Sequence, residues 1–382
     1  MTSQTMPLPA AQSQARNLRN LIILTLGGAL AGAAAGYFIG HALKSSGLAH
    51  KINPWVLLLS VPLGWLLSVA LHETGHVAGG LICGFRFYLF AAGPLRIERD
   101  GERLRVTFNR IPALWGGIAA CMPRTFGPQL RRQMLLLTAA GPLFSVLGAL
   151  LLMPAMSLRT SYLSISVFLT VFAFMSAVLA LATLLPTRLH GFNSDGARIL
   201  MLLQNATEGR RWIALASVTG LAALERPRDW PAELLNLLGD GSDSSPDAVN
   251  VCLLRHIWHL DRRAWEPARL WLERGLSNID FLPKPMRGRL HAAAAGFYAR
   301  PGNDAALALH YLNLAIQPGL HNPKEMHLIV ASVLIAEGRT QEALAELDLA
   351  AATVKSKPPH LAAALEEDLD ELRAAARCQG IL

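Results

Sequence analysis

The sequence predicts a mainly α-helical protein, in which a polytopic membrane bundle of about four helices with a small β-hairpin insert precedes a soluble domain of helical repeats. Two observations lead to this fold class. The chain of 382 residues is 52% hydrophobic and only 16% charged, which is apolar for a soluble protein. The apolar residues are also concentrated before about residue 200, so a membrane-embedded part is expected to precede an aqueous one.

Four segments are long and apolar enough to cross a bilayer, which requires roughly 20 residues of helix. These expected spans comprise residues 18–43, 54–82, 134–156 and 162–185. The first is rich in glycine and alanine, and such small residues allow helices to pack closely in lipid. Residues 1–17 are polar and rich in proline, glutamine and serine, so a disordered tail is expected rather than a cleavable signal.

Lysine and arginine residues predict the orientation of these spans. The segment between the second and third spans, residues 83–133, contains nine arginines, whereas the loops expected on the other side contain Lys44, Lys51 and Arg159. Positively charged loops stay in the cytoplasm, so this segment and both termini are expected there. The net charge of +8 is interpreted as topology and lipid-headgroup contact, because no nucleic-acid-binding motif accompanies it.

Part of the arginine-rich segment is predicted to form a small β-hairpin insert at residues 85–108. Residues 85–90 and 95–108 are typical of strands, and the second stretch contains a turn at 99–102 between two runs of alternating polarity. This hairpin is expected to lie at the membrane face. The membrane-embedded domain as a whole is predicted to comprise residues 18–205.

Residues 206–382 are predicted to form a cytoplasmic helical domain that resembles tetratricopeptide repeats. Small and apolar residues recur 35 positions apart, with Ala308, Leu312 and Ala315 matching Ala343, Leu347 and Ala350. Gly302 and Gly338 precede these two sets, and Ala268, Leu272 and Gly275 form a looser earlier copy. The spacing is close to the tetratricopeptide period of about 34 residues. The alternative is an ordinary helical bundle with alanine-rich interfaces.

The end of the second expected span carries the sequence HETGH at positions 72–76. His72 and His76 are four residues apart, so they project from one face of a helix and can bind a single zinc ion. Glu73 lies beside them and could take a proton from a water molecule that the metal activates. A short motif of this kind also arises by chance, but ionisable side chains within an apolar helix are costly and usually functional.

A zinc site needs at least a third protein ligand, and Asp195 is the strongest candidate. It follows the fourth expected span, which the orientation brings to the same membrane face as His76. Asp195 could equally cap the N-terminus of the helix that begins there, because aspartate and serine favour that position. His190 is a competing ligand. Cys83, one of four scattered cysteines, could also approach the metal, although free thiols in a reducing compartment are the simpler interpretation.

The ordered set of motifs resembles the site-2 protease family of intramembrane zinc metalloproteases. HETGH is followed by AAGPLRI, IPALWGG and AAGPLFS, and then by a proline-containing segment that ends in SDG. The resemblance covers about residues 55–200. The resemblance implies that His72, His76 and Asp195 bind zinc and that Glu73 activates water. It also implies that strands within residues 86–108 present an unwound substrate, usually a membrane-anchored protein.

The chain departs from the family at two positions where asparagine is common. Ser145 lies three residues after Pro142, and Thr183 lies three residues before Pro186. A hydroxyl group keeps some hydrogen-bonding capacity but lacks the paired donor and acceptor of an amide. Positioning of the substrate by an amide is therefore in question, whereas the expected metal ligands are intact.

The expected function is hydrolysis of peptide bonds in or near transmembrane segments, with a single-span membrane protein as substrate and a protein partner on the repeat domain. An alternative is a catalytically inactive, protease-like membrane scaffold that binds partners through the repeats, which the replacements at Ser145 and Thr183 would favour. A metal transporter would place its ligands in several spans near the bilayer centre, but the first and third spans carry no carboxylates.

Overall fold

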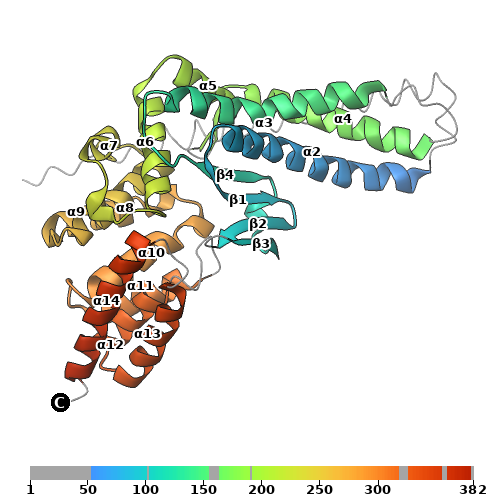
Figure 1. Ribbon diagram of the computed structural model, residues 1–382. Coiled ribbons are helices and arrows are strands. Elements are labelled where there is room, and N and C mark those ends of the chain that lie inside the picture. The colour runs from blue at the N-terminus through green and yellow to red at the C-terminus, as the bar shows by residue number, and fades with distance from the viewer. Residues whose placement is uncertain are drawn as a thin grey trace, which may run out of the picture. The chain divides into compact units, whose positions relative to one another are not determined.

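The computed structural model describes residues 53–100, 103–154, 163–189, 192–317, 326–354 and 359–379. The tail at 1–17, the first expected span at 18–43 and His190 lie outside the described residues. Within them the protein is mainly helical and contains a small antiparallel sheet (Figure 1). The chain divides into two compact units: one contains the residues up to Gly75 and Thr138–Leu200, and the other contains His76–Leu137 and Met201–Leu382.

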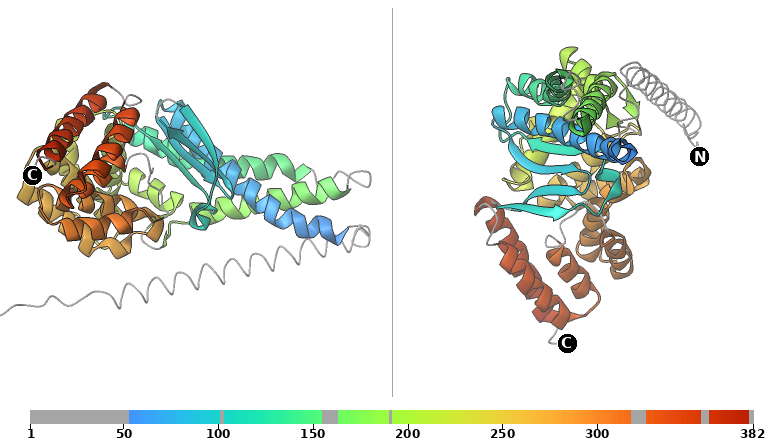
Figure 2. Two further views of the ribbon diagram at one scale, coloured as in Figure 1. Left: turned by 90° about the horizontal axis from the view of Figure 1, so that it is seen from below. Right: turned by 90° about the vertical axis from the view of Figure 1, so that its right-hand side faces the viewer.

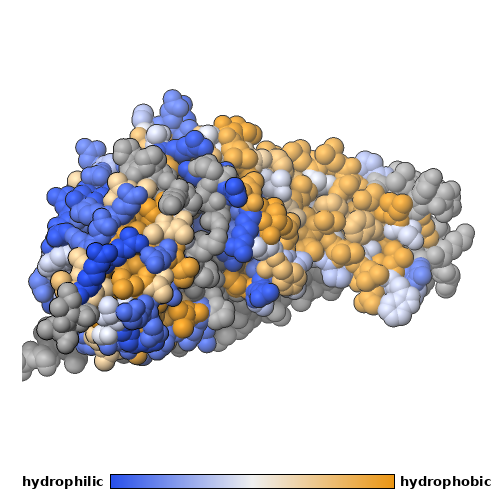
Figure 3. Space-filling view, turned by 60° about the horizontal axis from the view of Figure 1, so that its bottom comes forward, coloured by the Kyte–Doolittle hydropathy of each residue, from blue (hydrophilic) through white to orange (hydrophobic). Residues whose placement is uncertain are grey.

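Three helices in the described part of the chain are long and apolar enough to cross a membrane: α2 (Pro54–Ile82), α3 (Leu130–Leu152) and α4 (Leu163–Leu184). They confirm the second, third and fourth expected spans as apolar helices. Leucines on all three helices are exposed, and the space-filling view colours much of this surface as hydrophobic (Figure 3). An exposed apolar surface of this size indicates a membrane protein.

The third span begins earlier than expected, at Leu130 rather than at residue 134. Leu130 and Met134 are buried, whereas Arg131 and Arg132 are exposed. The first turn of α3 is therefore amphipathic, and a hydropathy pattern that requires continuous apolar residues leaves it out.

Buried hydroxyl groups connect α2 to α4. The Ser68 hydroxyl donates to the carbonyl oxygen of Gly64 at 2.7 Å, and Ser176 on α4 donates to Ser68 at 3.1 Å. Both serines are fully buried. Because lipid offers no competing partner, hydrogen bonds of this kind stabilise helix pairs in membranes.

The expected hairpin is part of a four-stranded antiparallel sheet (Figure 2), in which the strand order is β3-β2-β1-β4 (Figure 1). The strands are β1 (Arg86–Ala92), β2 (Leu95–Asp100), β3 (Arg103–Phe108) and β4 (Ile118–Met122). β1 and β4 pair through Ala91–Ile118 and Phe87–Cys121. β4 is an addition to the prediction, because the run Ile-Ala-Ala-Cys-Met lacks the alternating polarity by which a half-buried strand is recognised.

β3 forms one edge of this sheet, and one of its faces is apolar and exposed. Leu104, Val106 and Phe108 alternate along it and are 59%, 66% and 65% exposed. They align with Arg99, Ile97 and Leu95 on β2. An exposed apolar edge strand is suited to contact with a lipid surface or another protein.

After α4 the chain forms a short ribbon and then a series of helices. The ribbon pairs β5 (Arg188–Leu189) with β6 (Phe192–Asn193). The first helices are α5 (Asp195–Leu203), α6 (Thr207–Leu221), α7 (Ala232–Leu237), α8 (Pro246–Asp261) and α9 (Trp265–Ser277). The remaining helices are α10 (Gly288–Ala299), α11 (Ala305–Ala315), α12 (His327–Ala336), α13 (Thr340–Val354) and α14 (Pro359–Gln379).

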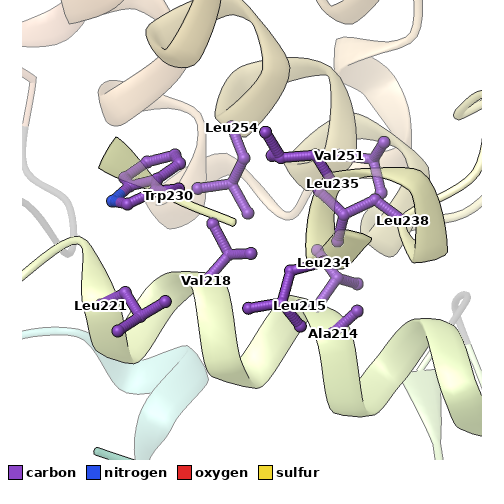
Figure 4. Close-up of a cluster of buried hydrophobic side chains, with 10 residues drawn as sticks. All are labelled: Ala214, Leu215, Val218, Leu221, Trp230, Leu234, Leu235, Leu238, Val251 and Leu254. Carbon is purple, nitrogen blue, oxygen red and sulfur yellow. The ribbon is translucent and has the colours of Figure 1, made fainter. Parts of the chain in front are cut away.

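Successive hydrophobic clusters hold these helices together. Ten buried side chains from α6, α7, α8 and the intervening segment, including Trp230, form the first cluster (Figure 4). Beyond it, α8 packs on α9, α10 on α11 and α12 on α13. In each pair the second helix is α9, α11 or α13, and the recurring positions found in the sequence are buried in all three. These positions are Ala268, Leu272, Gly275, Ala308, Leu312, Ala315, Ala343, Leu347 and Ala350. Small residues at these positions allow the paired helices to approach closely.

A buried histidine in α8 makes the stability of this helical region depend on pH. His256 is fully buried and bonded through Nδ1 to the carbonyl oxygen of Ala268 at 2.9 Å, and its Nε2 has no partner among the described residues. Burial lowers the pKa of His256 to about 4. The unfolded chain would take up the proton near pH 6.5, so stability is lost as the pH falls below 6.5, by up to about 3 kcal/mol at pH 4.

We therefore expect the midpoint of thermal unfolding, followed by tryptophan fluorescence, to fall between pH 7 and pH 5 in the wild type. His256→Gln keeps a donor for the Ala268 carbonyl group but does not titrate, so its midpoint should fall less. Equal pH dependence in the two proteins would show that another group is responsible.

Candidate metal centre

α2 positions the two histidines of the HETGH motif on one face, close to the C-terminal end of the helix. His72 and Glu73 are buried, and His76 is partly buried. Gly75 lies between them where α2 meets α3, and a Cβ atom at this position would overlap the carbonyl group of Ala140 and the Cα atom of Gly141. The glycine therefore lets the two helix backbones touch beside the histidines.

α3 orients both imidazole rings. The Ser145 hydroxyl lies 2.9 Å from Nδ1 of His72, and the carbonyl oxygen of Leu137 lies 2.9 Å from Nδ1 of His76. A carbonyl oxygen only accepts hydrogen bonds, so Nδ1 of His76 carries the proton and Nε2 keeps its lone pair. Partners of this kind fix the tautomer and orientation of metal-binding histidines. Pro142 lies between the two partners and has no N–H, which locally disrupts the hydrogen bonding of α3.

The segment after α4 brings in Asp195, the first residue of α5. The Ser194 hydroxyl accepts a hydrogen bond from the amide of Ala197 at 3.2 Å, which is the geometry of an N-cap. It also donates to the carbonyl oxygen of Leu185 at 2.6 Å. A Cβ atom at Gly196 would overlap the carbonyl group of Leu184, so glycine is needed for this close turn. Because Ser194 caps α5, the side chain of Asp195 is directed to another partner.

That partner is His72, and the three expected ligands meet. Oδ2 of Asp195 lies 3.1 Å from Nε2 of His72, and one ligand atom from each of His72, His76 and Asp195 lies within 4.8 Å of the others. In a tetrahedral site with bonds of about 2.0–2.1 Å, ligand atoms are separated by about 3.3 Å. The side chain of Asp195 is only 12% exposed. The three residues therefore form a compact, mostly buried group of donors.

The other residues considered from the sequence lie elsewhere. Cys83 donates from Sγ to the carbonyl oxygen of Gln133 at 3.5 Å and does not belong to the group of candidate ligands formed by His72, His76 and Asp195. Thr183 bonds to the carbonyl oxygen of Ala180, within its own helix. Ser145 contacts His72, a candidate metal ligand, a contact that its spacing after Gly-Pro did not reveal.

The donor set suits a divalent transition metal. Two imidazoles and one carboxylate leave one position of a tetrahedral ion open to water or substrate, as catalytic zinc sites do. The same donors accept other divalent metals, since imidazole and carboxylate ligands do not select zinc alone. Searches with the chain against family models, curated proteins and solved structures find no match.

The contact between Ser145 and His72 predicts a measurable effect on metal affinity. Removing the partner of a metal-binding histidine typically weakens binding by about 10–100-fold. We expect Ser145→Ala to weaken zinc binding by that factor, as measured by competition with a fluorescent chelator on the detergent-solubilised protein. Ser145→Thr retains the hydroxyl and should restore most of the affinity. An unchanged affinity in the alanine variant would show that the serine only packs against the ring.

Proposed function

We propose that the protein is an intramembrane zinc metalloendopeptidase, similar to the site-2 protease family, which hydrolyses peptide bonds in or near transmembrane segments of membrane-anchored proteins. One observation carries the proposal: His72, His76 and Asp195 meet beside Glu73 at the end of an apolar helix. A buried carboxylate next to a group of metal-binding donors is suited to act as a general base.

The proposed reaction assigns a role to each residue. Zinc, when bound, supplies a Lewis acid that polarises a carbonyl group and makes water more acidic. His72, His76 and Asp195 would hold the ion. Ser145 and the carbonyl group of Leu137 fix the orientation of the two imidazole rings. Glu73 takes a proton from the attacking water and passes it to the leaving amine nitrogen. Its burial keeps bulk water away from that carboxylate.

Hydrolysis within a membrane requires both water and an unwound substrate, because the carbonyl groups of a helix are hydrogen-bonded and shielded. An edge strand such as β3 presents N–H and C=O groups along its outer side, and an extended peptide can add to such an edge. The exposed apolar side chains of β3 would suit a segment drawn from lipid. We propose that this sheet receives the substrate in extended form.

The proposal includes a topology. Residues 18–43 would form a fourth span, which makes the protein a multi-pass membrane protein with both termini in the cytoplasm. The arginines of residues 83–133 support this orientation through the positive-inside rule. The helix pairs from α8 to α13, with buried small residues at equivalent positions, support a cytoplasmic domain of tetratricopeptide type that binds a protein partner.

The test compares the membrane proteomes of cells that carry the wild type or the Glu73→Gln variant. A single-span protein should accumulate uncut in the variant only, and the purified wild type should contain about one zinc ion per chain. Accumulation in neither strain, despite bound metal, would favour the inactive scaffold. Purified wild-type protein that binds no metal would end the enzyme proposal.

A further inference from the structure

Three arginines recur at one structural position in successive parts of the helical region. Arg226, Arg263 and Arg300 are spaced 37 residues apart in the sequence. Arg226 follows α6 by five residues, Arg263 follows α8 by two, and Arg300 directly follows α10. Each arginine thus lies just beyond the C-terminal end of the first helix of a pair or of its equivalent. We call these three residues the arginine row.

The arginine row contacts a single acidic helix, α14. Arg226 pairs with Glu367 at 2.5 Å, and Arg263 pairs with Glu371. Arg300 pairs with Glu371 at 3.1 Å and with Asp368 at 3.4 Å. The three acidic residues lie within two turns of α14 and on one side of it. One helix therefore reaches three arginines that are distant in sequence.

The apolar contacts of α14 have a different distribution. Leu369, Leu372 and Ala376 are buried in a cluster whose other members come from α12 and α13. The contacts between α14 and the arginine row, by contrast, are ionic. α14 thus packs by hydrophobic contacts on the last helix pair, and it contacts the arginine row through ion pairs.

The charges around the arginine row favour an acidic occupant. Asp261 neutralises part of the surface, because it accepts hydrogen bonds from Arg226 at 3.0 Å and from Arg228 at 3.4 Å. The arginine row and Arg228 together carry four positive charges, of which Asp261 balances one. The remaining three charges equal the number of paired carboxylates on α14. The ion pairs are partly exposed, with 60% of Arg263 and 43% of Glu371 accessible. Exposed ion pairs are individually weak and exchange readily.

We propose that the arginine row is a docking surface for an acidic amphipathic helix of a partner protein, and that α14 is its intramolecular occupant. The partner would carry carboxylates at the spacing of Glu367, Asp368 and Glu371 and would displace α14 from the row. An attached segment competes at an effective concentration near the millimolar range, so only a well-matched acidic helix succeeds. This inference does not depend on whether the protein is a protease.

The test uses the full-length protein in detergent and a fluorescein-labelled peptide with the sequence of residues 359–379, followed by fluorescence anisotropy at low salt. In the wild type the attached α14 should keep the peptide out. The variant Glu367→Gln/Asp368→Asn/Glu371→Gln weakens α14 on the row, so the peptide should bind about tenfold more tightly than to the wild type. Adding Arg226→Gln, Arg263→Gln and Arg300→Gln should abolish that gain.

Matched controls separate recognition from total charge. Glu366→Gln/Asp370→Asn removes two carboxylates of α14 that pair with no arginine of the row, and it should leave binding as in the wild type. Arg269→Gln removes an arginine whose partners among the described residues are Glu266 and Glu273 on its own helix, and it should have no effect in the weakened variant. Equal peptide binding by the wild type and the weakened variant would overturn the proposal.

A second measurement covers the case in which the weakened variant does not fold. In the wild type, raising the salt from about 0.05 M to about 0.5 M screens exposed ion pairs. Amide hydrogen exchange should then accelerate more in α14 than in α12. Exchange of α14 that is insensitive to salt would contradict the proposal. A wild-type dimer that dissociates when the three arginines are replaced would also contradict the proposal, because a second copy of the chain would then bind the arginine row.

Discussion

Replacing Glu73 with glutamine is expected to lower the rate of substrate hydrolysis by about 10²–10⁴-fold, the usual contribution of a general base, while the metal remains bound. Glutamine has nearly the size of glutamate and keeps hydrogen-bonding groups, but it cannot accept the proton of the attacking water. Glu73 is not one of the three grouped ligands, so zinc content should stay near one ion per chain. The measurement is the cleavage rate of the membrane protein that accumulates in the variant strain, made with purified components.

A neighbouring residue offers the control for this experiment. Thr74 is exposed, and its hydroxyl donates to the carbonyl oxygen of Ala70 within α2. Thr74→Val should therefore leave both cleavage and zinc content near the wild-type values. If Glu73→Gln cleaved the substrate at the wild-type rate with zinc bound, another group would have to be the base.

The second large effect is expected from Asp195. Asp195→Ala removes a proposed ligand. Loss of a residue that only supports a ligand weakens metal binding by about 10–100-fold, and we expect the loss of zinc affinity in Asp195→Ala to be larger. The carboxylate lies 3.1 Å from Nε2 of His72, and the four-coordinate site would be left with two protein ligands. Zinc content after dialysis against a weak chelator measures the loss directly.

Ser194 separates the two roles that the sequence allowed for Asp195. Ser194→Ala removes the cap of α5, which typically costs about 1 kcal/mol of stability, but it leaves the ligand set intact. We expect that variant to melt earlier and to keep its metal, whereas Asp195→Ala should lose the metal. Full zinc content in Asp195→Ala would mean that the carboxylate is not a ligand.

The apolar spans could be predicted from the sequence because their signal is local. A run of roughly 20 apolar residues has few structural solutions in water or lipid, and residues 54–82 coincide with α2. The buried alanines and leucines of the second helices were also recognisable, since their spacing repeats. Conversely, β4 depends on pairing with β1, more than 25 residues earlier in the chain, and its own five residues carry no strand pattern.

The individual residues of the candidate site could be predicted from the sequence, but the contacts between residues that are distant in the chain could not. The spacing of His72 and His76 places them on one helix face whatever surrounds them. Whether Asp195 caps α5 or faces a histidine depends on its neighbour, because serine and aspartate both favour the cap position. Ser145 illustrates the same limit: its contact with His72 joins residues 73 positions apart, and no local pattern reports such a distance.

The histidines and the aspartate of the candidate metal site are held by different parts of the chain. Both imidazole rings are oriented by contacts with α3. Gly75 of α2 allows the backbones of the two helices to touch. The carboxylate arrives separately, on a turn that begins where α4 ends. A cation at this position would link the two imidazoles to the turn that carries Asp195. Loss of the ion would remove this link between the paired imidazoles and the segment that follows α4.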